Sequence, residues 1–179
     1  MKNSIGNSIR LLSVILVIVV VAACSNNNDN NDNTMSTADK LVGTWTTSVT
    51  NIDASVGTQS LTDYLVNDVG LSATDAATQF GLFVASLESE VTGSLTLNAD
   101  NTYESNFGSG TGNGTWSLSA DEKTLTLLEG SDTILISIIS ISGNTLNASI
   151  GDTIPVDLDN DPGTADVDVT VEATLTLTK

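Results

Sequence analysis

The clearest structural signal in this 179-residue chain is its C-terminal run, Val167-Asp-Val-Thr-Val-Glu-Ala-Thr-Leu-Thr-Leu-Thr178. Apolar and polar residues alternate along the whole run. Successive side chains of a β-strand point to opposite faces, so strict alternation predicts a strand with one buried and one solvated face. The run therefore predicts a sheet whose outer face is rich in threonine.

Similar alternating runs recur along the chain, and turn sequences separate them. The expected strands cover residues 41–50, 93–98, 102–107, 114–118, 124–128, 133–141, 144–150 and 167–178. Seven of these eight runs follow one another through short links, which favours an antiparallel meander. Eight strands can close into a barrel that is either filled by side chains or wide enough for one small ligand. We expect an all-β fold: an eight-stranded antiparallel meander barrel formed by residues 39–179.

Residues 59–91 break the alternation. Two segments, Ser60-Leu-Thr-Asp63 and Ser72-Ala-Thr-Asp75, have the spacing of a helix-capping box, with Asp in place of the usual Glu. Apolar residues at helical spacing follow each of them. The sequence thus predicts a two-helix insertion between the first two strands, and three of the seven aromatic residues, Tyr64, Phe80 and Phe83, lie in it.

Short motifs in the predicted strands resemble those of the lipocalins and of looser bacterial lipocalin-like lipoproteins. The first strand holds Gly43-Thr-Trp45, and the fourth holds Gly114-Thr-Trp116. The hairpin Leu95–Tyr103 is similar to the Leu-x-Leu-x-x-Asp-Gly-x-Tyr pattern of these proteins, with Asn101 in place of Gly. The sequence departs from lipocalins in the place of its helices, in lacking a disulfide, and in having no later Arg to pack on the first Trp.

The resemblance implies a lipocalin-like barrel whose end is closed by Trp45, with Trp116 in a similar role. It also implies a barrel that binds a small apolar ligand or an envelope component, and we expect Tyr64, Phe80 and Phe83 near the mouth of its cavity. Simple core packing is the favoured interpretation of both tryptophans, because an indole buries a large area. The alternative function is a structural or interaction protein with a filled barrel, whose helical pair docks a partner.

The N-terminus carries an export signal. Lys2 and Arg10 precede an apolar run, residues 11–23, that is shorter than the about 20 residues a membrane-spanning helix needs. The run ends in Val21-Ala-Ala-Cys24, which resembles a bacterial lipobox. We therefore expect a signal peptide over 1–23, lipidation of Cys24 including palmitate-type acyl chains, and a flexible Asn/Asp-rich tether over 24–38. The plainer interpretation is an ordinary signal peptide with a chance cysteine. Ser25 favours the outer membrane of a Gram-negative bacterium as the anchoring site.

The composition excludes many activities. The chain has no His and a single Cys, so zinc, copper or haem sites and histidine-based catalysis lack their ligands. Five Lys and Arg against 22 Asp and Glu make a nucleic-acid partner untenable. No carboxylate pair is marked as catalytic, so we expect a non-enzyme without a cofactor; the oligomeric state is left open.

A calcium loop is the one metal site that the sequence suggests. Asp157, Asp159, Asp161 and Asp168 occupy positions 1, 3, 5 and 12 of an EF-hand-like spacing. Pro162 stands where the sharp turn needs glycine, and no helices flank the segment. The favoured interpretation is an acidic hairpin loop.

Overall fold

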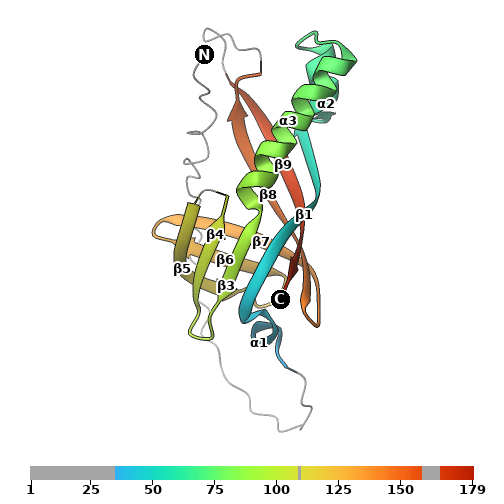
Figure 1. Cartoon of the computed structure of the whole chain (residues 1–179). Helices are drawn as coiled ribbons and strands as arrows, with labels where there is room; N and C mark the ends of the chain where they lie inside the picture. Colours follow the sequence, from blue (N-terminus) through green and yellow to red (C-terminus); the bar gives the residue numbers. More distant parts are fainter. Residues whose placement is uncertain (1–34, 109, 159–165) are drawn as a thin grey trace.

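The structure, a computed structural model, describes residues 35–108, 110–158 and 166–179 (Figure 1). Eight antiparallel strands follow one another around a barrel, and the last strand pairs with the first to close it. They are β1 (Gly43–Val56), β3 (Gly93–Leu97), β4 (Thr102–Phe107), β5 (Gly110–Leu118), β6 (Thr124–Glu129), β7 (Asp132–Ser142), β8 (Thr145–Val156) and β9 (Val167–Thr178). The predicted eight-stranded meander barrel is confirmed.

The first strand differs most from its predicted bounds. It begins at Gly43, after the short helix α1 (Thr37–Leu41), and runs to Val56. A register shift beside Thr50 moves the inward-facing positions from odd to even numbers, so that Trp45 and then Ile52 point into the core. A β-bulge of this kind interrupts the two-residue period, which is why alternation in the sequence does not reveal the second half of the strand. A short strand, β2 (Gln59–Ser60), turns back on the end of β1.

The two predicted helices are present as α2 (Leu61–Asn67) and α3 (Ala73–Val91). Ser60 and Ser72 cap them, because each hydroxyl accepts a hydrogen bond from the backbone N–H three residues on. Their Asp partners bind the serine hydroxyls, at 2.7 Å for Ser60 and Asp63. The insertion between the first two long strands therefore contains both helices and the extra strand β2.

Three strands continue beyond the others. The pairing of β8 with β9 extends to Val156, whereas β7 pairs with β8 only as far as Ser149. The paired end of β1 continues beside β9 as far as Ser55. This three-stranded extension is covered by the helical insert, since α2 and α3 both pack against β1 and bury Leu61, Leu65 and Ala76 (Figure 1). The helices thus complete a hydrophobic core that the shorter strands leave open.

Candidate functional site

Part of the barrel interior is filled by its own side chains. A set of inward-facing residues has no solvent-accessible surface at all: Leu41, Trp45, Leu95, Leu125, Leu127, Leu146 and Ala148. No water-sized space, inside or outside the barrel, adjoins these side chains. Close packing of this kind is typical of a protein core. This part of the barrel is therefore a packed core.

Trp45 is fully buried, and a lysine lies over its ring. Its indole Nε1 donates a 2.7 Å hydrogen bond to the carbonyl of Leu41. Nζ of Lys179, the last residue, lies 4.4 Å from the centre of the ring and donates 2.6 Å bonds to the carbonyls of Lys40 and Val42. Burial lowers the pKa of Lys179 below its ordinary value. A lysine at the C-terminus therefore packs on Trp45, although the sequence offers no later Arg.

The two Gly-x-Trp glycines are required for different reasons, a positive φ at Gly43 and close backbone packing at Gly114. A Cβ at Gly43, whose φ is +133°, would come within 3.1 Å of Cε of Lys179. A Cβ at Gly114 would lie 2.0 Å from the carbonyl oxygen of Leu128. Trp116 is buried, and its Nε1 donates a 2.9 Å bond to the carbonyl of Asn98. Both tryptophans are thus core residues that are held by backbone carbonyls.

The aromatic residues of the insert lie at the margin of the core. Phe80 and Phe83 are partly buried and pack against the core cluster, and Tyr64 is partly exposed. Leu82, on the same helix, is 69% exposed. The structure therefore brings Phe80 and Phe83 to the edge of the helix–sheet contact.

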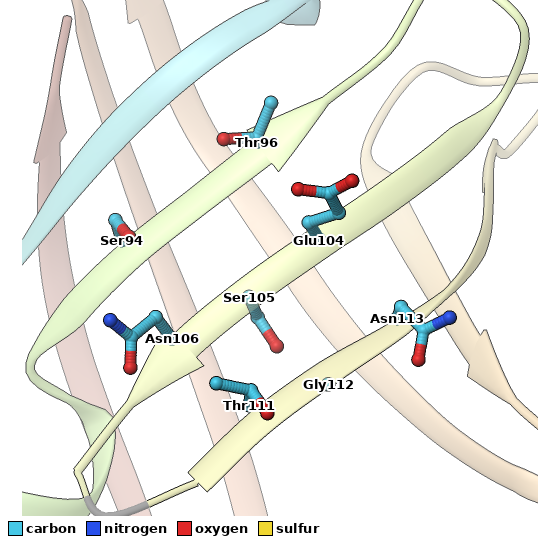
Figure 2. Close-up of a pocket in the computed structure, with 8 residues that line it drawn as sticks. All are labelled: Ser94, Thr96, Glu104, Ser105, Asn106, Thr111, Gly112 and Asn113. Carbon is cyan, nitrogen blue, oxygen red and sulfur yellow. The ribbon is translucent and has the colours of Figure 1, made fainter.

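A cavity of ≈ 400 Å³ lies elsewhere, on the outer face of β3, β4 and β5 (Figure 2). Cross-strand pairing arranges its polar side chains in two rows. Thr96, Glu104 and Asn113 form one row, and Ser94, Asn106 and Thr111 form the other. Ser105 and Gly112 complete its lining. We call this surface the polar depression.

Several polar side chains of the depression have no hydrogen-bond partner within the described residues and are therefore available to bind a ligand. Within the described residues, the side chains of Glu104, Asn106 and Asn113 form no hydrogen bond or salt bridge with the protein. Thr96 shares a 3.0 Å hydrogen bond with Thr44. The sequence places these residues on an outer strand face, and nothing in alternation distinguishes them from ordinary solvated positions. Their grouping comes from the register of β3, β4 and β5, which places them side by side.

Among the described residues, three acidic groups have shifted pKa values, and each shift has a local cause. Hydrogen bonds from the side chain and backbone of Thr102 lower the pKa of Asp100, within the turn between β3 and β4. The Ser119 hydroxyl does the same for Asp121. Burial, and then the charge of Glu129, raise the pKa of Tyr103. The two aspartates stabilise turns, and Tyr103 belongs to the core.

The predicted calcium ligands lie only partly in the described structure. Asp159 and Asp161 lie outside the described residues, whereas Asp157 and Asp168 are exposed near the ends of β8 and β9. Nowhere in the described ranges do three or more His, Cys, Asp or Glu residues gather as a metal site. Cys24 also lies outside the described residues, and no helix among those described is long and apolar enough to cross a membrane.

Comparisons with known proteins show little likeness. No family model and no curated protein matches the chain. Among solved structures, it is similar to a DUF4847 family protein from Bacteroides vulgatus, at 13% sequence identity. The match covers 75% of this chain and 92% of that protein, with a TM-score of 0.35, and a likeness of this strength supports no functional argument.

Proposed function

We propose that the chain is a lipid-anchored, non-catalytic protein of the bacterial cell envelope. Its filled barrel is a rigid scaffold, and its outer surfaces make the functional contacts. The observation that carries this proposal is the complete burial of a set of side chains inside the barrel, among them Trp45, Leu127 and Leu146. A barrel of eight strands is narrow enough for side chains to fill it.

Membrane anchoring rests on the lipobox-like Val21-Ala-Ala-Cys24. Two or more acyl chains on one residue anchor a protein stably, whereas a single chain binds only marginally. The test is to express the wild type and Cys24→Ala in a Gram-negative host and to separate membranes from soluble protein. Release of the variant into the soluble fraction supports the anchor, and equal partitioning of the two proteins contradicts it.

The proposal that the protein is not a catalyst is motivated by the environment of two acidic residues. General acid–base sites depend on carboxyl groups whose pKa is tuned by burial or by a close partner. Asp100 and Asp121, the carboxylates with lowered pKa values, are fully exposed, and they bind the residues of their own turns. They thus have a structural role in the hairpins. Hydrolysis of ester, glycoside and phosphate test substrates by purified protein would contradict the proposal.

The hypothesis that the filled barrel serves as a scaffold can be tested by fluorescence. A filled barrel excludes apolar probes, so the fluorescence of Trp45 and Trp116 stays unchanged when a fatty acid or a hydrophobic dye is added. Native mass spectrometry of the purified protein then shows the polypeptide and its anchor without further lipid. Stoichiometric quenching of the tryptophan fluorescence, or a lipid retained by the Cys24→Ala protein, would contradict the scaffold hypothesis. Either result would favour a barrel that binds a ligand.

A small apolar ligand at the helical insert is the second candidate. It is favoured by the partial exposure of Phe80 and Phe83 at the edge of the core, next to the exposed Leu82. A ligand at this place would shift the NMR signals of α3 while leaving those of β5 and β6 in place. The substitution Leu82→Asp would weaken it, and Leu135→Asp is the matched control, because Leu135 is 57% exposed on β7 of the barrel.

A further inference from the structure

We infer that the polar depression is a binding site for a neutral saccharide. This inference goes beyond the proposed scaffold function and does not depend on it, because it rests on the outer face of β3, β4 and β5. The cavity of ≈ 400 Å³ is within the size range of small-molecule sites. Figure 2 shows the side chains of Glu104, Asn106 and Asn113 around it, on two neighbouring strands.

The functional groups of the depression suit a ligand that both donates and accepts hydrogen bonds. Glu104 offers two acceptor oxygens, Asn106 and Asn113 offer both amide donors and carbonyl acceptors, and Thr111 offers a hydroxyl. Neighbouring hydroxyl groups of a sugar can donate together to one carboxylate, and charge-assisted bonds of this type are stronger than neutral ones. The polar groups therefore match a ring that carries several hydroxyls.

The strand pairing fixes the backbone positions from which these side chains extend. Thr96, Glu104 and Asn113 face one another across three hydrogen-bonded strands, and the row of Asn106 runs beside them. Neighbouring positions on adjacent strands lie about 4.5–5.5 Å apart, a spacing that lets two side chains reach hydroxyls on one sugar ring.

Other ligand classes fit less well. Glu104 would repel an anion, and the lining has no Lys or Arg to attract one. The net charge of the chain, −17, adds to this repulsion. Calcium takes six to eight oxygen ligands, and carboxylates supply the charge that balances the ion; Glu104 is the single carboxylate of the lining. A peptide strand would need a free sheet edge, and β4 is already paired on both sides. A lipid chain also fits poorly, because its apolar surface would contact the hydroxyl and amide groups of the lining.

The lining contains no aromatic residue on which a sugar ring could stack. Hydrogen bonds must therefore supply most of the affinity, so we expect weak, millimolar binding that is sensitive to each polar side chain. An envelope polysaccharide with repeated units would be a suitable natural ligand, because many weak contacts add up along a repeating chain.

The test is an NMR titration of the full-length protein in a zwitterionic detergent, since maltoside and glucoside detergents would compete. The ligands are cellobiose, maltose and N,N′-diacetylchitobiose, with digalacturonate as the charged control. At least one neutral disaccharide should shift amide signals within residues 94–96, 104–106 and 111–113. Digalacturonate should leave them in place.

The matched variants are Glu104→Ala and Asn113→Ala in the depression and Glu172→Ala on the exposed face of β9. Each depression variant should weaken binding about tenfold, the effect of losing one good hydrogen bond, and Glu172→Ala should bind like the wild type. Thermal unfolding of all three checks that the fold is intact. The inference is overturned if no neutral disaccharide shifts these signals, if digalacturonate binds equally well, or if the depression variants bind like Glu172→Ala. None of these results would alter the membrane partitioning that tests the anchor.

Discussion

The contact of Lys179 with Trp45 allows a quantitative prediction. Removing the ammonium in Lys179→Ala eliminates two 2.6 Å bonds to backbone carbonyls and the ring contact at 4.4 Å. Hydrogen bonds from a charged donor contribute about 1.5–3 kcal/mol each, and an exposed cation–π contact about 0.5–1 kcal/mol. Solvent screens an exposed lysine, so we expect a smaller total loss of about 2 kcal/mol.

The loss should be visible in thermal and denaturant unfolding. For a domain of this size, about 2 kcal/mol corresponds to a fall in Tm on the order of 6–8 °C. The denaturant midpoint should fall without a change in slope, because the surface exposed on unfolding is nearly constant. Lys179→Met keeps most of the apolar stem and removes the charge, so it should lose most of the same stability if the ammonium is the cause.

Lys123→Ala is the matched control. It removes the same charge from an exposed turn where only the backbone of Lys123 makes hydrogen bonds. Its Tm should stay close to that of the wild type. The reasoning is refuted if Lys123→Ala and Lys179→Ala destabilise equally, which would indicate a general charge effect, or if neither does. A full loss in Lys179→Ala with none in Lys179→Met would assign the stability to packing of the stem.

Three further predictions follow from single positions. Thr47 is buried, and its hydroxyl has no hydrogen-bond partner within the described structure. Thr47→Val should therefore raise the free energy of unfolding, measured by urea denaturation, by about 1 kcal/mol. A lower free energy of unfolding in the variant would mean that the hydroxyl has a partner. Gly114→Ala places a methyl group 2.0 Å from a backbone carbonyl oxygen of β6, so it should destabilise the protein by about 2 kcal/mol or more. Gly81→Ala has open space around it in α3 and should stabilise the protein by about 0.5–1 kcal/mol. Calorimetric unfolding of both variants checks the opposite signs. Hydrogen bonds from Thr102 lower the pKa of Asp100 below 3.8, so its contribution to stability is present above pH 3.8 and is lost as the pH falls through the lower folded value; a carboxyl NMR titration with its midpoint at or above 3.8 would contradict this.

The strands and helices were predictable where one local rule governs each residue. Alternation located the C-terminal strand at residues 167–178, and Ser60 and Ser72 located the starts of both helices. Asn101 replaces the Gly of the hairpin pattern and adopts φ +65°, which asparagine tolerates better than most residues. The first strand was predicted too short, because its bulge beside Thr50 exchanges the inward and outward positions.

The site was less accessible to prediction. The aromatic residues of the insert suggested a ligand because large apolar side chains are common in pockets, yet the same side chains are equally suited to cover the sheet extension. Glu104, Asn106 and Asn113 were predictable as outer-face positions, but their grouping depends on the register of three strands. Register depends on contacts between distant residues, which no local pattern reports.

Composition and local periodicity were sufficient to predict the eight-stranded meander, the two capped helices and the acidic, histidine-free chemistry of the chain. These properties follow from residue counts and from repeats of two and 3.6 residues, which can be recognised in a short stretch of sequence. The packed part of the barrel core, the contact of Lys179 with Trp45 and the polar depression on three strands became visible in the folded structure alone. Packing density and cross-strand neighbours exist only after the chain closes on itself, when residues far apart in sequence come within hydrogen-bond distance.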